Sequence, residues 1–279
     1  MKPKKNKQAM LLHILVNAAA LITFLVLILI IVYILIKGLP HLSLELFAPN
    51  YTTDNCSMLP SIIYTICMVL LAMVIAVPFG IGAAIYLVEY AKRGNKVVAI
   101  IRLTTETLAG IPSIVYGLFG FLFFVSYLGW NKSLLSGAVT LAIMVLPTII
   151  RTTEEALKAV PDSYREGSFG LGAGHVRTIF KVILPTAIPG ILSGIILSIG
   201  RMVGETAALI YTAGTAAGAF ESVMSSGRTL AVHMYMLSGE GLHTDQAYAV
   251  AVVMLGIVIG INWLSSFVAK KLTVGDENE

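Results

Sequence analysis

The sequence predicts an all-α integral membrane protein with six transmembrane helices. Of its 279 residues, 57% are hydrophobic and only 12% are charged, and the mean hydropathy is +0.87. A soluble domain carries about 25% charged residues, so this chain has too few to cover a water-facing surface. Two cysteines are too few for a disulfide-rich secreted scaffold, and a net charge of +4 without a basic stripe gives no indication of nucleic-acid binding.

Long uncharged runs separate the charged residues. A helix needs about 20 apolar residues to cross a bilayer core, and the alternation of a β-barrel is absent, so each long run is predicted to be a helix. The first run is predicted to be a retained anchor and not a signal peptide, because it is too long and no small-residue cleavage site follows it. The predicted spans lie near residues 10–36, 60–88, 108–129, 133–151, 185–212 and 247–269.

The distribution of Lys and Arg predicts the orientation of the spans. With six spans both termini lie on one side, and cytoplasmic segments of membrane proteins are enriched in Lys and Arg. If the termini are inside, the outer segments hold only Lys37, Lys132 and Arg228. The inner segments then hold Lys2, Lys4, Lys5, Lys7, Lys92, Arg93, Lys96, Arg102, Arg151, Lys158, Arg165, Arg177, Lys181, Lys270 and Lys271. We therefore expect a multi-pass protein of a bacterial cytoplasmic (inner) membrane, surrounded by lipid, with both termini cytoplasmic.

Arg201 and Glu205 lie inside the fifth predicted span. An Arg at the membrane centre costs about 2.5–3.5 kcal/mol on insertion scales, which favours a position facing a bundle interior or a wet path. The spacing i, i+4 would place both side chains on one helix face. One interpretation is a self-neutralising ion pair that only holds the helix.

The other interpretation of this pair is an anion site in a substrate path. A guanidinium fits a tetrahedral oxyanion with two parallel hydrogen bonds. Glu205 would fix Arg201 or accept a proton from an oxyanion that carries an OH, as phosphate does and sulfate does not. Thr206 adds a hydroxyl, and Gly200 and Gly204 leave room for a ligand. A single Arg is a small site for a divalent anion, so we expect a second subunit to supply more charge.

Motifs for nucleotide and metal binding are missing. No G-x-x-x-x-G-K-[ST] sequence occurs, and Gly170, Gly172 and Gly174 are not followed by Lys-Ser/Thr. The five histidines show no ligand spacing. We therefore expect no cofactor and no metal in this chain, and a protein that is not an enzyme.

The longest inner segment, 152–184, is predicted to form two short helices. Pro161, Asp162 and Ser163 are predicted to start the first one with a capping residue. The glycines that follow break it, and a second segment, His175–Ile183, leads into Pro185. The two helices would form an L-shaped protrusion.

This segment carries a known spacing. The run Glu166-Gly167-Ser168-x3-Gly172-x9-Val182-x-Leu184-Pro185 resembles the loop E-A-A-x3-G-x9-I-x-L-P of binding-protein-dependent ABC importer permeases. Glu166, Gly172, Leu184 and Pro185 match, whereas Gly167, Ser168 and Val182 depart from the commonest letters.

The chain length, the long first outer loop and the Gly/Ala-rich stretch 213–220 resemble the A-type subunit of the phosphate (Pst-type) permeases more than the C-type. Two further stretches resemble the Pst-type permeases in general. They are Gly110-Ile-Pro-Ser-Ile-Val-Tyr-Gly117 and Gly200-Arg-x-x-Gly-Glu-Thr-Ala207. The resemblance covers about residues 10–270 and implies the type I ABC importer permease fold. It implies an N-terminal tail, first span and extracytoplasmic loop in 1–59, a permease core in 60–271 with the coupling loop 152–184, and a cytoplasmic tail in 272–279.

The resemblance also implies partners. An extracytoplasmic binding protein would deliver phosphate, a C-type permease would complete the path, and two ATPase subunits would bind ATP and Mg and drive transport. The residues that would dock on the ATPase are Arg165, Glu166, Gly167, Ser168 and Gly172.

Other functions stay open at this stage. An ABC permease for phosphonate, sulfate, molybdate or a polar amino acid fits the same loop. A secondary anion carrier fits less well, because such proteins usually repeat their broken helices in two inverted halves. A non-transporting assembly protein would not need Arg201. Arg151 is either a membrane anchor or part of the exit path, and Tyr211 is a candidate for an outer gate.

Overall fold

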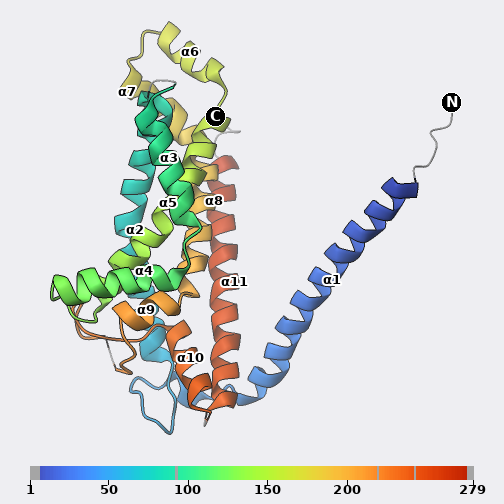
Figure 1. Ribbon diagram of the computed structural model, residues 1–279, viewed down its shortest axis with the longest axis vertical. Coiled ribbons are helices and arrows are strands. Elements are labelled where there is room, and N and C mark those ends of the chain that lie inside the picture. The colour runs from blue at the N-terminus through green and yellow to red at the C-terminus, as the bar shows by residue number, and fades with distance from the viewer. Residues whose placement is uncertain (1–6, 92–93, 219, 242, 275–279) are drawn as a thin grey trace.

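The computed structural model describes residues 7–91, 94–218, 220–241 and 243–274, and this part of the chain is helical with connecting loops (Figure 1). The α-helices are α1 (Lys7–Gly38), α2 (Leu59–Ile85), α3 (Lys96–Ala109), α4 (Ser113–Gly120), α5 (Leu134–Ala159), α6 (Asp162–Gly170), α7 (His175–Thr178), α8 (Leu184–Val203), α9 (Ala207–Thr212), α10 (Leu230–Glu240) and α11 (Thr244–Val274). Three π-helical segments extend them, η3 (Tyr86–Tyr90), η4 (Phe121–Tyr127) and η5 (Ile179–Ile183), and two 3-10 turns, η1 (Leu39–His41) and η2 (Leu44–Phe47), follow α1.

Within the described residues, five helices are long and apolar enough to cross a membrane, and there are six if one bent pair counts as a single span. The prediction of an all-α membrane protein is therefore confirmed. These five helices are Met10–His41, Leu59–Tyr90, Leu134–Ala159, His175–Val203 and Thr244–Leu264.

The third predicted span, 108–129, is wrong as a straight helix. The structure has α3 followed by a second helical part, α4 with η4. The helix direction changes by 102° between α3 and this second part (Figure 1). Pro112 adopts φ −59° and ψ 142°, outside the helical region, and a proline also disfavours helix at the residue before it. Because α3 already begins at Lys96, the third span starts well before residue 108.

The fifth predicted span, 185–212, is wrong at both ends. The observed span begins at His175, and α8 ends at Val203, after which the short helix α9 begins at Ala207. Gly204 has low helix propensity, and the next residues start a new helix. The break lies between Arg201 and Thr206, at the residues that carry the predicted site.

The centre of the bundle is formed by α2, α5 and α8. Met68, Leu141 and Val145 are fully buried between them. Small residues allow the backbones to approach closely: a Cβ added at Gly194 of α8 would overlap the Thr152 side chain of α5. A small residue at position 194 therefore allows α8 to pack closely against α5.

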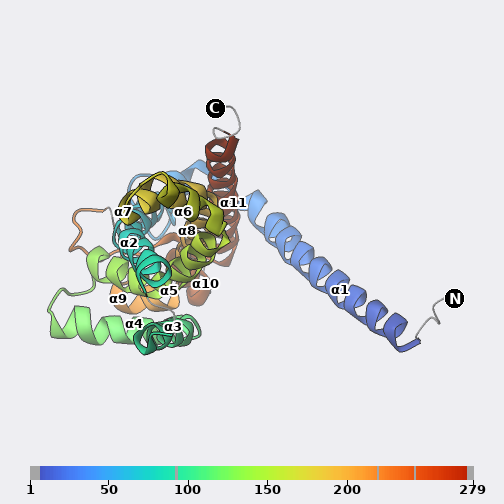
Figure 2. The ribbon, with the colours of Figure 1, turned by 90° about the horizontal axis from the view of Figure 1, so that it is seen from above.

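Helix α1 stands apart from this bundle over most of its length (Figures 1 and 2). It contacts α11 near its C-terminal end, where the rings of Tyr33 and Tyr248 lie 5.8 Å apart edge to face. The start of α1 and the end of α11 lie at the same end of the molecule as α6 and α7 (Figure 1). We call this the inner end, and the opposite end, with α10, the outer end.

The segment 39–58 at the outer end is more ordered than the polar sequence indicates. Leu46, Cys56 and Met58 are buried against α10 and α11. The Asn55 side-chain oxygen accepts hydrogen bonds from the backbone N–H groups of Thr52 and Ser57, both at 2.9 Å. These two bonds give side-chain partners to N–H groups of the loop backbone. The outer end also contains the short helix α10.

Candidate functional site

A charged groove of about 490 Å³ opens between α3, α5 and α8. We call it the inner groove. It carries four basic side chains and three carboxylates, so that its formal balance is +1. These are Arg102, Arg151, Lys158 and Arg201, with Glu106, Glu154 and Glu155.

Arg201 lies in the last turn of α8 and is exposed to the inner groove. Among the described residues, no carboxylate lies within 4.0 Å of its guanidinium. Space is present beside it, because a Cβ added at Gly200 would meet no atom within 4 Å. Arg201 therefore presents an unpaired cation to an open cavity.

Glu205 does not share a helix face with Arg201, and that prediction is wrong, because α8 ends at Val203. The residue is 8% exposed, and its Oε1 accepts a hydrogen bond of 3.1 Å from the backbone N–H of Ala208. The carboxylate thus satisfies one of the free N–H groups at the start of α9.

Thr206 lies on the other side of the break. Its hydroxyl donates to the Gly204 carbonyl at 3.4 Å, and it lines a second groove of about 710 Å³ together with Tyr211. We call this the outer groove; it is formed mainly by residues of α9, α10 and α11. The three predicted path residues are therefore close in sequence, but Arg201 and Thr206 belong to different cavities.

Two helix breaks lie between the grooves. One is the bend between α3 and α4, and the other is the α8–α9 break. Ala109 lines the inner groove and Ile114 the outer one. Helix α4 packs on α9 so closely that a Cβ at Gly117 would lie 2.7 Å from the Ala208 Cα. The segments that follow the two breaks, α4 and α9, therefore pack directly on each other.

The other charges of the inner groove are partly neutralised. Glu154 is 8% exposed, and its Oε1 lies 2.6 Å from both Arg102 and Lys158. Arg151 Nε donates to Glu155 at 3.0 Å, and both of these side chains are largely exposed. The Arg102 bridge also ties α3 to α5, so one carboxylate holds the bent span against the bundle.

The predicted docking residues occupy the protruding loop of α6 and α7. Glu166, Gly167 and Gly172 are exposed, and Gly172 adopts φ +82°. Ser168 is half-buried, with its hydroxyl 2.9 Å from that of Thr178. The expected side-chain cap at the start of α6 is absent: Pro161 occupies the N-cap position without such a bond.

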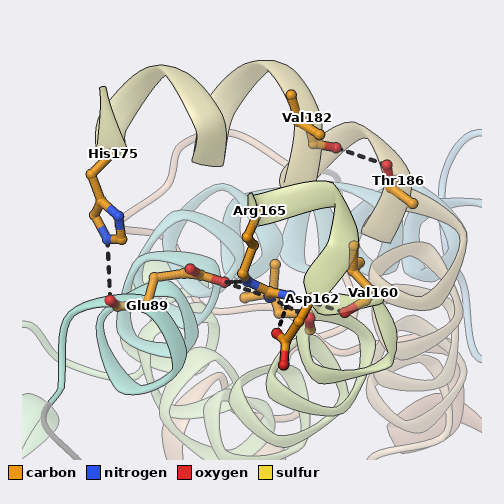
Figure 3. Close-up of polar contacts among 8 residues, drawn as sticks. Glu89, Val160, Asp162, Arg165, His175, Val182 and Thr186 are labelled. Atoms are coloured by element: carbon orange, nitrogen blue, oxygen red, sulfur yellow. Dashed lines mark hydrogen bonds and ion pairs between the residues drawn. The ribbon is translucent and has the colours of Figure 1, made fainter. Parts of the chain in front are cut away.

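Arg165 differs from the other predicted docking residues because it points inward (Figure 3). Its guanidinium donates to Glu89 at the end of η3, with Nη2 at 2.7 Å from Oε1. Its role in direct docking stays a prediction. Sequence reasoning missed Glu89, although this carboxylate at the end of the second apolar run was a visible signal.

Comparisons with known proteins identify the family of this chain. The family described as binding-protein-dependent transport system inner membrane component matches residues 76–274. The probable ABC transporter permease protein YqgI of Bacillus subtilis is 32% identical over 264 residues, which are 86% of this chain and 89% of YqgI. The phosphate transport system permease protein PstA 1 of Mycobacterium tuberculosis is 43% identical over 143 residues, but these are only 51% of this chain and 46% of PstA 1.

A solved structure shows the same fold. The bacterial alginate ABC transporter in complex with an alginate pentasaccharide-bound periplasmic protein contains a chain that aligns with 96% of this chain and 98% of its own length. The TM-score is 0.67 at 16% identity, so the likeness concerns the fold alone.

The fold and the family match define a membrane-spanning component of an ABC importer. The chain belongs to the binding-protein-dependent transport system inner membrane components. It is a multi-pass permease and not a catalytic subunit, and ATP is handled by a partner ATPase.

Proposed function

We propose that this permease forms half of the translocation path of an ATP-driven phosphate importer, and that Arg201 binds the passing anion. The observation that carries the proposal is the unpaired, exposed guanidinium of Arg201 in the inner groove. A fixed cation at such a site has the geometry to bind an oxyanion through two hydrogen bonds. The likeness to PstA 1, which covers about half of that protein's length, supports phosphate as the cargo.

The path in this proposal passes between two helix breaks. In this proposal the packing of α4 on α9 closes the path between the inner groove and the outer groove. Movement of α9 away from α4 would join the cavities and bring an anion from the Thr206 side to Arg201. A C-type permease would supply the other wall and further charge, and an extracytoplasmic binding protein would deliver the phosphate.

The energy source in this proposal lies outside the chain. Two ATPase subunits would dock on the exposed surface of the loop, at Glu166, Gly167 and Gly172. Ser168 would act from within the loop, because its hydroxyl already contacts Thr178. Nucleotide-driven closure of the ATPases would then move the loop and the helices attached to it.

The test is uptake of radiolabelled phosphate by vesicles that contain the complete complex with its ATPase, second permease and binding protein. We expect ATP-dependent uptake that excess sulfate does not reduce. Arg201→Gln should abolish uptake while the complex still assembles, and Arg201→Lys, which keeps the charge but loses the planar fork, should retain part of it.

Two outcomes would contradict the proposal. Normal uptake by Arg201→Gln would remove Arg201 from the path. Competition by sulfate, molybdate or a phosphonate as strong as that by unlabelled phosphate would assign the permease to another oxyanion.

A further inference from the structure

Both helices of the inner loop contact the same residue, Glu89 of η3, which extends α2. Arg165 of α6 donates to the Glu89 carboxylate oxygen Oε1 through Nε at 3.2 Å and Nη2 at 2.7 Å. His175 of α7 places Nε2 at 3.1 Å from the Glu89 backbone oxygen. Figure 3 shows the two contacts on opposite sides of Glu89. We call Glu89, Arg165 and His175 the Glu89 clamp.

The hydrogen-bonding capacity of Arg165 is fully used inside this chain. A guanidinium has five N–H donors. Besides the two bonds to Glu89, Nη2 donates to the Leu157 carbonyl at 3.0 Å, and Nη1 donates to the Val160 carbonyl at 2.9 Å and to Asp162 Oδ1 at 3.3 Å. The side chain is 16% exposed. No donor is left for a partner protein, so the inward position of Arg165 does not suit direct docking.

The Glu89 carboxylate is equally committed. Its side chain is 5% exposed, and a charge withdrawn from water is tolerated only with a close partner. Loss of Arg165 would leave this carboxylate without its cation, because the structure gives it no other ion-pair partner among the described residues. We therefore expect the ion pair to keep Glu89 and Arg165 in contact when the loop moves.

Aromatic rings reinforce the contact at His175. The His175 ring lies edge to face on Tyr90, with ring centroids 5.0 Å apart, and stacks on Phe169 of α6 at 5.9 Å. The same imidazole thus touches η3 on one side and α6 on the other. These contacts therefore link both loop helices to η3.

Glu89 is well placed to pass a movement on. It lies at the inner end of the span Leu59–Tyr90, which packs along α5 toward the outer end. Near the other end of this span, the Tyr64 hydroxyl donates to the Ser225 carbonyl at 3.3 Å. One helix therefore joins the inner loop to the outer segment that precedes α10.

Resting on the proposed function, we propose that the Glu89 clamp couples the loop to transport: it passes the movement that the ATPase imposes on α6 and α7 to α2, and so to the groove. Glu89 and Arg165 are positioning residues in this role, since they touch neither ATP nor the anion. The exposed residues of α6 would dock on the ATPase, and the inward-pointing Arg165 would pull η3 and with it α2.

The test uses the complete complex and two measurements in each variant. The first is the amount of phosphate taken up per ATP hydrolysed. The second does not depend on the cargo: it is the ATP- and vanadate-induced change in maleimide labelling of a cysteine introduced into the inner groove by Thr105→Cys. If the wild type shows the labelling change but no phosphate uptake, the proposed cargo is wrong and the clamp is still tested.

Glu89→Gln should leave assembly and ATP hydrolysis in place, lower uptake per ATP roughly 2- to 30-fold, and reduce the labelling change to a similar extent. Exchanging the charges, with Glu89→Arg and Arg165→Glu together, should restore part of both. Asp162→Asn is the matched control. It removes the negative charge of an exposed partner of Arg165 within the same helix and leaves the contact of Arg165 with Glu89 of η3, so the uptake ratio should not change.

Three results would overturn the proposal. The first is an unchanged ratio and labelling response in Glu89→Gln. The second is loss of ATPase co-purification in Arg165→Lys with an unchanged ratio in Glu89→Gln, which would make Arg165 a docking residue. The third is failure of assembly in every variant, including the exchanged pair, which would make the clamp a folding contact only.

Discussion

The carboxylate of Glu205 accepts a hydrogen bond from the backbone N–H of Ala208 at 3.1 Å. This contact places the acid at the start of α9 and removes it from Arg201. A helix whose first N–H groups have a side-chain acceptor begins at a defined residue. The bond therefore stabilises the break in the fifth span, and with it the position at which α9 packs against α4.

The first prediction separates capping by Glu205 from a role of its charge. Glu205→Gln keeps a side-chain oxygen that can accept from Ala208, so most of the phosphate uptake should remain. Glu205→Ala removes the acceptor and should cost about 1 kcal/mol of stability, as loss of a helix cap does. Thermal unfolding in detergent and vesicle uptake check the pair. Equal loss of uptake in both variants would show that the negative charge itself is required.

The second prediction concerns the charge balance of the inner groove. Arg151→Gln removes one positive charge and should weaken phosphate binding about 2- to 5-fold, whereas Glu155→Gln removes one negative charge and should strengthen it by a similar factor. These factors correspond to about 0.4–1 kcal/mol for a charge at short range in a wet site. The KM of uptake at two salt concentrations measures the effect, which should shrink at high salt.

The control for this prediction is Lys181→Gln, an exposed lysine outside the inner groove. It changes the net charge of the chain as Arg151→Gln does, and it should leave KM unchanged. A change of the same direction in Arg151→Gln and Glu155→Gln would contradict an electrostatic effect. It would instead indicate that the bond between the two side chains maintains local structure.

Hydropathy predicted the existence of the spans well but not their interruptions. An uncharged run reports only that a segment can cross hydrocarbon. The interruption around Pro112 was visible in the sequence as Gly110-Ile111-Pro112, but it was interpreted as the start of a span and not as a bend inside one. The same limit affected Glu205, because the i, i+4 rule applies only while the helix continues.

Long-range partners were beyond sequence reasoning. Arg165 precedes Glu166 in the loop, so the two were given the same role. In a helix, successive residues point about 100° apart, and here the Arg165 side chain is half-buried while that of Glu166 is exposed. The partner of Arg165 is 76 residues away, and no local pattern in a single sequence identifies such a pair.

The third prediction concerns the turn between α6 and α7. Gly172 adopts φ +82°, and a Cβ added there would meet no atom within 4 Å. Gly172→Ala would therefore act only through backbone strain, of roughly 1–2 kcal/mol for a left-handed residue with a side chain. We expect the loop to change shape and less ATPase to co-purify with the permease.

The matched control for the turn is Gly170→Ala. Gly170 is also surrounded by open space, but it lies at the end of α6 without a positive φ. Alanine there should be tolerated, and ATPase co-purification should stay at the wild-type level. Equal losses in both variants would mean that the docking surface needs small residues and not the turn.

The fourth prediction is a dependence of stability on pH that arises from His233 of α10. Burial, and then the nearby charge of Arg228, lower the pKa of His233 to about 4 from its ordinary 6.5, whereas the hydrogen bond to the Cys56 carbonyl opposes the shift. The folded state resists protonation of His233. The contribution of His233 to the free energy of unfolding is therefore fully present above about pH 6.5, and it falls as the pH drops toward 4, by at most about 3 kcal/mol. Thermal unfolding in detergent between pH 7 and 4 measures this loss.

Two histidine variants test the assignment to His233. His233→Gln keeps a donor for the Cys56 carbonyl but does not titrate, so it should flatten the profile. His41→Gln, at an exposed histidine, should follow the wild type. An identical slope in His233→Gln would assign the acid sensitivity to other groups.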